Sequence, residues 1–293
     1  MQVPVRAWWQ AILASPARLA WADFKLAEGA TNEAARLLQE IADKDPGYTP
    51  AFIRLARIAL MERRFNDGMA IADSILKKEP RHADALLLRG RAQLALAQNA
   101  DALKTFETLV SQYPRLAEAR YHLAMALVRN GDVKRALLEL NQCMDIRPAF
   151  VEPAVLFGEL NLRNGNPDAA IAELERLLKL RPDALRALSV LGAAYRAKGM
   201  TPKAEEIHRQ VIAAQPENPM GYFNLGMTLR DRKKMDEALQ AFEAALERAP
   251  DFIPALMETA ELTARNGQRE AAVTRIRKQI EQAPNISGLW GLL

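Results

Sequence analysis

Apolar residues along this chain recur with a period of 34 residues. We number the positions of each repeat from 1 to 34, starting the first repeat at Ser15, and call the residues that share a number in all repeats a column. Columns eight and twenty hold only alanine or glycine in all eight repeats. Columns seven and twenty-four hold mostly larger apolar residues, among them Leu123 and Phe242. Because two antiparallel helices approach closely only where side chains are small, the first two columns mark a helix–helix contact and the other two fill the core beside it. The pattern predicts two packed helices in every repeat.

Proline marks the end of the second predicted helix of each repeat. Eight prolines stand 34 residues apart without a shift of register: Pro46, Pro80, Pro114, Pro148, Pro182, Pro216, Pro250 and Pro284. Proline lacks a backbone N–H and ends a helix instead of continuing it. A fixed period of this length indicates a stacked array of similar helix–turn–helix units, and such arrays usually act through their surface, by holding partners.

Column fifteen and the starts of several helices carry turn and capping residues. Column fifteen lies between the two helices of a repeat and is glycine in five of them: Gly29, Gly131, Gly165, Gly199 and Gly267. Glycine readily adopts the left-handed conformation that lets the chain reverse. Threonine or asparagine precedes a first-turn proline in Thr49-Pro50, Asn166-Pro167, Thr201-Pro202 and Asn218-Pro219. We expect each of these four side chains to cap its helix.

The composition is that of a folded helical protein. Of 293 residues, 49% are hydrophobic and 6% aromatic, and the net charge of +4 is a mild excess that does not require a nucleic-acid partner. Cys143 is the lone cysteine, so no internal disulfide can form. No apolar run is long enough to predict a transmembrane segment, and the first residues resemble a signal peptide only poorly. We expect a cytoplasmic protein; a periplasmic or membrane-associated location is the alternative.

The repeat resembles the tetratricopeptide repeat (TPR). The best match is the seventh repeat, with Tyr222, Leu225-Gly226, Leu229, Ala238, Phe242, Ala245 and Pro250. The resemblance covers residues 15–286, in repeats that start at 15, 49, 83, 117, 151, 185, 219 and 253. It departs from the family pattern at Arg18, Arg89, Arg120 and His208. It implies an all-α, right-handed superhelical solenoid of about eight antiparallel helix–turn–helix units, whose first helices line a concave groove.

Columns two, five, six, nine, twelve and thirteen of the first helices are expected to face that groove. Their side chains change along the array from basic through apolar to acidic. The candidate partner-binding residues are Arg54, Arg57, Leu87, Arg91, Tyr121, His122, Met125, Met220, Phe223, Asn224, Met227, Arg230, Glu258 and Glu261. Such a groove suits an extended or helical segment of a protein with an acidic end and apolar anchors. The alternative is that these residues simply pack against neighbouring repeats.

Two arginines are the strongest candidates in this set. Arg57 and Arg91 occupy column nine in adjacent repeats, which places two guanidinium groups side by side in an arrangement suited to a carboxylate or phosphate. Solvated surface arginine is the alternative interpretation. A second set of arginines shares column thirteen and consists of Arg129, Arg163 and Arg265. This column lies in the last turn of the first helix, where a cation offsets the helix dipole. That structural role explains most of the preference for arginine in column thirteen.

The sequence holds no catalytic or metal-binding motif. It has no phosphate-binding glycine loop, no His-Glu-x-x-His, no Gly-x-Ser-x-Gly and no Cys-x-x-Cys. Glu205 and His208 have a Glu-x-x-His spacing, but di-iron sites need it twice and His208 falls in a core column. Cys143 falls in column twenty-seven and is expected to be an inert core residue. We expect no catalytic residue, no metal and no cofactor, and therefore no enzyme.

Apolar segments flank the array at both ends. Residues 1–14 predict an apolar helical extension, and residues 287–293 an apolar tail. Terminal repeats of a solenoid need a cover for their free faces. Folding back is favoured at the N-terminus and self-association at the C-terminus, with peripheral membrane contact as a further alternative. The residues concerned are Trp8, Trp9, Leu289, Trp290, Leu292 and Leu293.

These features favour a non-enzymatic scaffold or adaptor that holds a protein or peptide partner in its concave groove. The alternatives are the interaction module of a larger enzyme, an envelope or polysaccharide assembly factor, and a self-assembling structural protein. Nothing in the residues names the partner, because a fold alone does not convey function.

Overall fold

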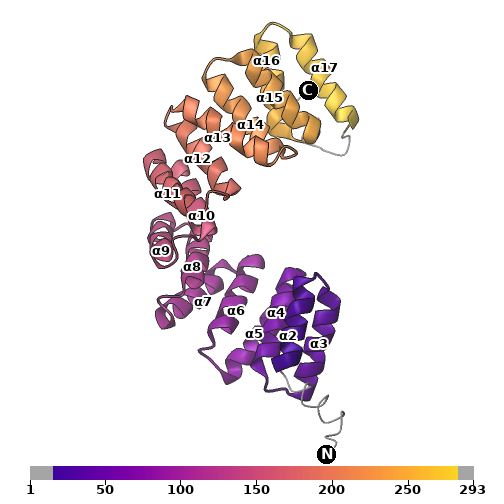
Figure 1. Ribbon diagram of the computed structural model, residues 1–293, viewed down its shortest axis with the longest axis vertical. Helices are drawn as coiled ribbons and strands as arrows, with labels where there is room; N and C mark the ends of the chain where they lie inside the picture. Colours follow the sequence, from indigo (N-terminus) through magenta and orange to yellow (C-terminus); the bar gives the residue numbers. More distant parts are fainter. Residues whose placement is uncertain (1–15, 283–293) are drawn as a thin grey trace, which may run out of the picture. The chain divides into compact units, whose positions relative to one another are not determined.

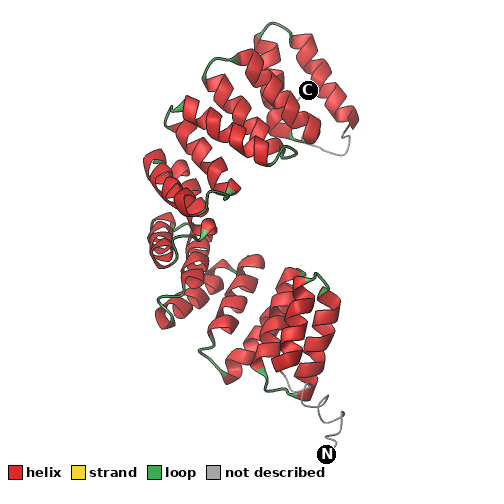
Figure 2. Cartoon of the chain, in the orientation of Figure 1, coloured by secondary structure: helices red, strands yellow, loops and turns green. Residues whose placement is uncertain are grey.

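The computed structural model describes residues 16–282, which form helices joined by short turns, and this range contains no strand (Figure 2). Sixteen helices follow one another within it (Figure 1). Their bounds are α2 (Pro16–Ala27), α3 (Thr31–Lys44), α4 (Thr49–Met61), α5 (Phe65–Lys78), α6 (Ala83–Ala95), α7 (Asn99–Gln112), α8 (Ala117–Arg129), α9 (Val133–Ile146), α10 (Val151–Arg163), α11 (Pro167–Leu180), α12 (Leu185–Ala197), α13 (Thr201–Ala214), α14 (Pro219–Asp231), α15 (Met235–Arg248), α16 (Ile253–Arg265) and α17 (Arg269–Gln282). None of the described helices is long and apolar enough to cross a bilayer.

The helices form eight pairs, one pair in each repeat. From α4 onward each first helix has 13 residues and starts at column one, and each second helix has 14 residues and starts at column seventeen. The second helices end two residues before the column of regularly spaced prolines, as α5 ends at Lys78 ahead of Pro80. This confirms the predicted all-α array of eight helix pairs. The predicted segments 1–14 and 287–293 lie outside the described residues.

The chain divides into two compact parts of four repeats each, Met1–Ile146 and Arg147–Leu293. Within the N-terminal part, α2 to α9 pack in order along the chain, and within the C-terminal part α10 to α17 do the same. Within each part, a second helix therefore lies between the first helix of its own repeat and the first helix of the next repeat. This stacking buries the core, in which Phe242 and Leu256 of the C-terminal part are completely inaccessible to solvent.

Column eight is small because a side chain of column twenty-four occupies the space beside it. A Cβ atom added to Gly90, Gly192 or Gly226 would come within 3.0 Å of a ring in the same repeat. The three rings are those of Phe106, His208 and Phe242, and all are buried. The sequence suggested a close approach of two backbones at this column. In these three repeats an aromatic ring takes that space instead.

Column fifteen adopts the left-handed conformation in every repeat. The five predicted glycines do so, and Arg63, Ala97 and Lys233 follow with φ of 61°, 58° and 62°. A residue with a Cβ atom pays roughly 1–2 kcal/mol for this conformation. The turn between the two helices is therefore imposed by the packing of the repeat even where glycine is missing.

One of the four predicted helix caps is present. Asn218 precedes α14, and its side-chain oxygen accepts the N–H of Met220 at 3.0 Å. Asn166 precedes α11 without making a capping bond. Thr49 and Thr201 are already the first residues of α4 and α13, so they lie inside the helices that they were expected to cap. These three predictions are wrong.

Candidate functional site

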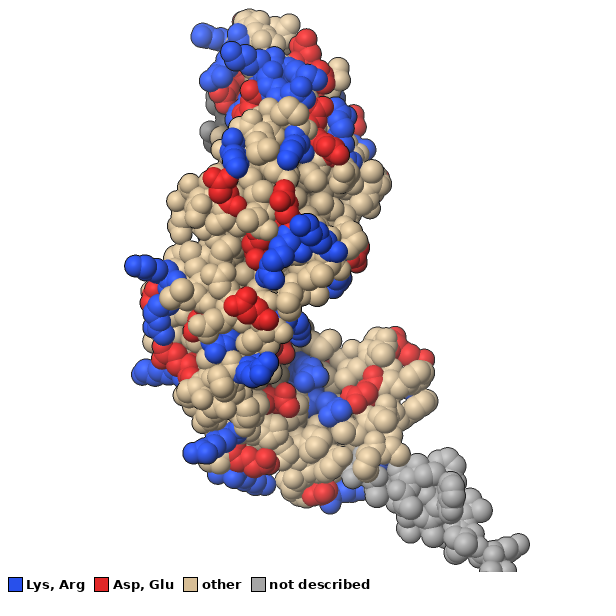
Figure 3. Space-filling model, turned by 60° about the vertical axis from the view of Figure 1, so that its left-hand side comes forward, with Lys and Arg blue, Asp and Glu red and all other residues tan. Residues whose placement is uncertain are grey.

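Charge pairing decides which residues of the first helices are free to bind. Basic and acidic side chains lie interspersed over the face shown in Figure 3. An arginine beside a carboxylate is largely compensated, whereas one without such a neighbour keeps its attraction for an acidic partner. We use the name first-helix face for the side chains in columns two, five, six, nine, twelve and thirteen, and describe this face separately in each part.

Arg57 and Arg91 are uncompensated in the N-terminal part. Arg57 is exposed and Arg91 half-buried, and in the described part of the chain neither has an Asp or Glu oxygen within 4.0 Å. Their charges act on neighbouring groups. The pKa of Asp23 is lowered chiefly by its hydrogen bond with Arg54, and Arg57 contributes. Burial lowers the pKa of His122 to about 3, and Arg91 adds to this effect.

Arg54 is already held by a carboxylate of the preceding repeat. Its Nε and Nη2 donate to the two carboxylate oxygens of Asp23 at 2.6 and 2.7 Å, and Nη1 donates to the carbonyl of Pro50 at 3.2 Å. This bidentate pair raises the pKa of Arg54. The same set of candidates contains Leu87, which is buried in the core. Arg54 and Leu87 therefore support the first-helix face and offer a partner little.

The candidates on α8 form an aromatic cluster. The His122 ring is nearly parallel to that of Phe106, with centroids 5.5 Å apart, and is tilted against Tyr121 at 5.3 Å. Its Nδ1 is buried without a hydrogen-bond partner, and its Nε2 lies 3.9 Å from a carboxylate oxygen of Glu118. Because its pKa is lowered, His122 is neutral at pH 7 and belongs to the apolar surface. Met125, half-buried, continues column nine onto α8.

The apolar candidates of the C-terminal part differ in how much surface they offer. Met220 is 46% exposed, and Met257 in the next repeat is 52% exposed. Phe223 is half-buried and meets Phe252 edge to face at 5.3 Å. Met227 packs against the same core. Met220 and Met257 are thus accessible to a partner, while Phe223 and Met227 mainly contact their neighbours.

The acidic candidates of the C-terminal part are neutralised by arginines. Arg230 of α14 forms an ion pair with Glu258 of α16, and Arg265 pairs with Glu261 at 2.7 Å. Asn224 is half-buried on α14. The predicted acidic end of the groove is therefore largely compensated within the protein.

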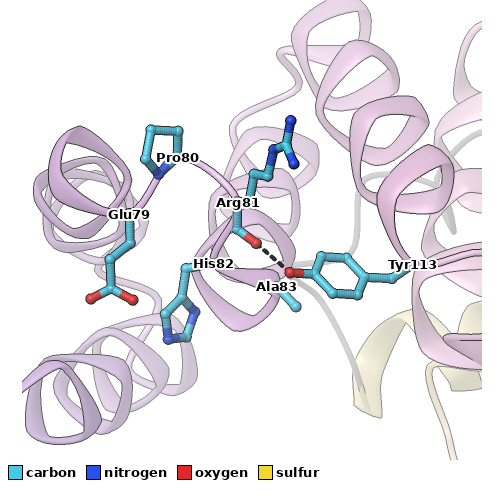
Figure 4. A pocket seen from close by; sticks show the side chains of 6 residues that line it. All are labelled: Glu79, Pro80, Arg81, His82, Ala83 and Tyr113. Atoms are coloured by element: carbon cyan, nitrogen blue, oxygen red, sulfur yellow. Dashed lines mark hydrogen bonds between the residues drawn. The ribbon is translucent and has the colours of Figure 1, made fainter.

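A shallow cavity of about 600 Å³ lies where α5, α6 and α7 end or begin (Figure 4). It is lined by Glu79, Pro80, Arg81, His82, Ala83 and Tyr113. The Tyr113 hydroxyl donates to the carbonyl of Arg81 at 2.6 Å, and His82 Nδ1 accepts the N–H of Ala85 at 3.4 Å. The sequence reasoning missed this cavity because it is built from the turns of consecutive repeats. The hydrogen bonds of Tyr113 and His82 hold those turns.

The Glu-x-x-His pair on α13 does not form a site. The carboxylate of Glu205 makes ion pairs with Arg209 at 2.9 Å and with Arg232. The His208 ring points into the core, where both ring nitrogens are buried without a partner. Burial, with a contribution from Arg196, lowers the pKa of His208 to about 4. No group of three or more His, Cys, Asp or Glu side chains in the described residues is placed to hold a metal ion.

Three solved structures are similar to this chain in fold. They are the APC/C hetero-tetramer Cut9–Hcn1 (TM-score 0.64, 17% identity, 96% of this chain and 55% of that chain), the C-terminal part of a TPR repeat-containing protein from Cytophaga hutchinsonii (0.62, 17%, 82% and 99%), and YrrB, a TPR protein with an unusual peptide-binding site (0.53, 17%, 64% and 96%). This chain spans about half the length of the first of these. At such identities the likeness is one of fold.

Sequence comparisons name the family. No curated protein sequence matches the chain significantly. Models described as tetratricopeptide repeat match residues 25–92, residues 87–144 and 155–219, and residues 219–252. These matches cover most of the eight repeats. The chain belongs to the tetratricopeptide repeat family.

Proposed function

We propose that this protein is a scaffold that holds a segment of a protein partner on the first-helix face of its N-terminal part. The observation that carries the proposal is the pair Arg57 and Arg91, two cations in one column that have no Asp or Glu oxygen within 4.0 Å in the described residues. Column nine continues with Met125 on α8. A segment with acidic residues followed by an apolar anchor complements this order.

The family supports a role in protein–protein contact, and one structural relative is a TPR protein with a peptide-binding site. The mild net charge of +4 and the interspersed acidic groups favour a peptide over a nucleic acid. The same face holds no built set of catalytic groups. His122 is half-buried and neutral, and Tyr121 packs against it.

Charge reversal tests the proposal. The double variant Arg57→Glu, Arg91→Glu is compared with the matched control Arg36→Glu, Arg115→Glu, which changes two exposed arginines away from this face. The probe is a panel of fluorescent peptides that place Asp or Glu residues ahead of Leu or Met. We expect the Kd of the tightest peptide to rise at least about tenfold in the first variant and to change little in the control. Equal affinity for both variants would refute the assignment.

A further inference from the structure

The first described helix has an apolar face that no described helix covers. Trp21 and Phe24 of α2 are 51% and 48% exposed. Their rings stack on each other with centroids 5.2 Å apart and 20° between planes, and the ammonium of Lys25 lies 5.1 Å from the Trp21 ring. Two large stacked aromatic rings in water are a liability for an isolated protein. We call this pair the α2 aromatic face.

The same columns are covered in the other repeats of each part. Phe24 stands in column ten of the first repeat. The residues of this column in other repeats are buried: Ile58, Ala92, Ala126, Ala194, Thr228 and Leu262. The cover is the second helix of the preceding repeat. On α4, Leu55 and Ile58 belong to one apolar cluster with Leu38 and Ile41 of α3. The α2 aromatic face is therefore the place where a preceding second helix would pack.

The sequence ahead of α2 keeps the register of such a helix. Counting back through the repeat places residues 1–10 in columns twenty-one to thirty, the last ten of the fourteen columns that a second helix occupies. Trp8 then falls in column twenty-eight, which is apolar in all eight repeats. Trp9 falls in column twenty-nine, which is exposed in all eight. Arg6 and Gln10 fall in columns twenty-six and thirty, which hold polar residues in most repeats.

Side-chain size is complementary as well. Columns twenty-four and twenty-seven, which hold Leu38 and Ile41 on α3, hold Pro4 and Ala7 in the segment ahead of α2. Between α3 and α4, Leu38 and Ile41 thus pack with Leu55 and Ile58, which are all medium-sized residues. In the same register, Pro4 and Ala7, which are smaller than Leu38 and Ile41, would face the two large rings of α2, so the larger side chains on one helix would offset the smaller ones on the other.

We infer that residues 1–14 of the same chain dock on the α2 aromatic face in the place of a preceding second helix, with Trp8 turned toward α2 and Trp9 turned to solvent. A second copy stacked head to tail fits less well. On α17, the last described helix, columns twenty-four and twenty-seven hold Ile276 and Gln279, which are already buried, so no apolar surface is free there for two aromatic rings. The exposed residues of α17 include Arg277 and Lys278, whose charges would lose hydration against such rings. Docking by residues 1–14 requires no second molecule and does not depend on the proposed function.

The two neighbouring tryptophans provide a matched test. Amide hydrogen exchange of α2 is measured in the full chain, in Trp8→Ser and in Trp9→Ser, each at two protein concentrations, with light scattering alongside. We expect Trp8→Ser to speed exchange of α2 at least about tenfold, Trp9→Ser to leave it within about twofold, and exchange in α4 to α17 to stay unchanged in both. Phe24→Ser should speed α2 exchange as Trp8→Ser does, and the two together should add little, because both remove the same contact.

Several results would overturn the inference. Equal effects of Trp8→Ser and Trp9→Ser would refute the register. Unchanged α2 exchange in Trp8→Ser would refute the docking itself. Protection of α2 that falls on dilution, together with a dimer in light scattering, would assign the face to a second copy. Since Trp8 lies outside the described array, unchanged exchange in α4 to α17 shows that the array of the variant is folded.

Discussion

Replacing His208 by phenylalanine should stabilise the C-terminal part. His208 is 1% exposed and occupies the core column in which the third and seventh repeats hold Phe106 and Phe242. Both of its ring nitrogens lack a hydrogen-bond partner. The ring lies against Gly192 as the two phenylalanine rings lie against Gly90 and Gly226. The substitution His208→Phe therefore removes two unsatisfied polar atoms from a site shaped for an aromatic ring.

Two opposing terms set the size of this effect at pH 7. A neutral imidazole has one donor and one acceptor, and leaving each of them buried without a partner costs roughly 1–3 kcal/mol. The larger phenyl ring costs about 1–3 kcal/mol where a core must shift to admit it. Gly192 already leaves the space that a phenyl ring needs, so this cost should be at the low end. We expect a net gain of about 2 kcal/mol in the free energy of unfolding.

The gain should increase in acid. Burial lowers the pKa of His208 from 6.5 to about 4, so between these values the unfolded chain binds a proton that the folded chain does not. The stability of the parent therefore falls as the pH falls from about 6.5 to about 4, by about 3 kcal/mol in total. Phenylalanine does not titrate, and the advantage of His208→Phe should reach about 5 kcal/mol near pH 4.

Hydrogen exchange of α12 and α13 is the appropriate assay, because an array of repeats does not unfold as one unit. Exchange is measured at pH 7 and at pH 4.5 in the parent and in His208→Phe. The N-terminal part serves as an internal control, since the pKa of His122 is lowered to about 3 and its own loss of stability in acid should be the same in both proteins. A variant that exchanges faster at pH 7, or that keeps the parent's loss of protection in acid, would refute the reasoning.

Two further predictions concern columns fifteen and eight. Each of Arg63→Gly, Ala97→Gly and Lys233→Gly should raise the free energy of local unfolding of its two flanking helices by about 1 kcal/mol, measured by hydrogen exchange, because each residue has a positive φ that favours glycine; faster exchange of these helices would contradict the assigned turn. Gly226→Ala should destabilise by about 1–3 kcal/mol because its Cβ would meet the ring of Phe242, and the smaller Phe242→Leu should reduce that loss when combined with it. Additive losses in the double variant would show that the two columns do not share this space.

The helices were predictable from the sequence because one period governs every structural column. Small residues, core residues and prolines each return at the same spacing, so a weak signal in one repeat is reinforced by the seven others. Capping was less predictable. A cap depends on where one helix starts to within a single residue, and α4 and α13 start at the threonines that the pattern placed outside them. The left-handed conformation of Arg63, Ala97 and Lys233 was not predictable from these residues, because the packing of the repeat overrides their local preference.

The candidate site was predictable only in part, because several ion pairs join residues of different repeats. Asp23 and Arg54 are 31 residues apart, and Arg230 and Glu258 are 28 apart, so each pair joins neighbouring repeats. These spacings fall short of the 34-residue period by about one helical turn and about two, and they place a residue of one first helix beside a residue of the next. The sequence therefore contained a signal for pairing that a column-by-column count of charges could not show.

Pairing across repeats also explains why the two parts should differ in what they bind. In the C-terminal part, Arg196 pairs with Asp231 at 3.1 Å and Arg230 pairs with Glu258, so most arginines of its first-helix face are paired within residues 16–282, Arg163 in the last turn of α10 being an exception, and Met220 adds exposed apolar surface. In the N-terminal part, Arg57 and Arg91 have no such neighbour among the described residues. A compensated arginine fixes the geometry of the array, and an uncompensated one is available to a ligand. The acidic part of a partner should therefore be recognised at Arg57 and Arg91, and its binding there should weaken as salt rises, while contacts with the methionines of the C-terminal part should depend little on salt.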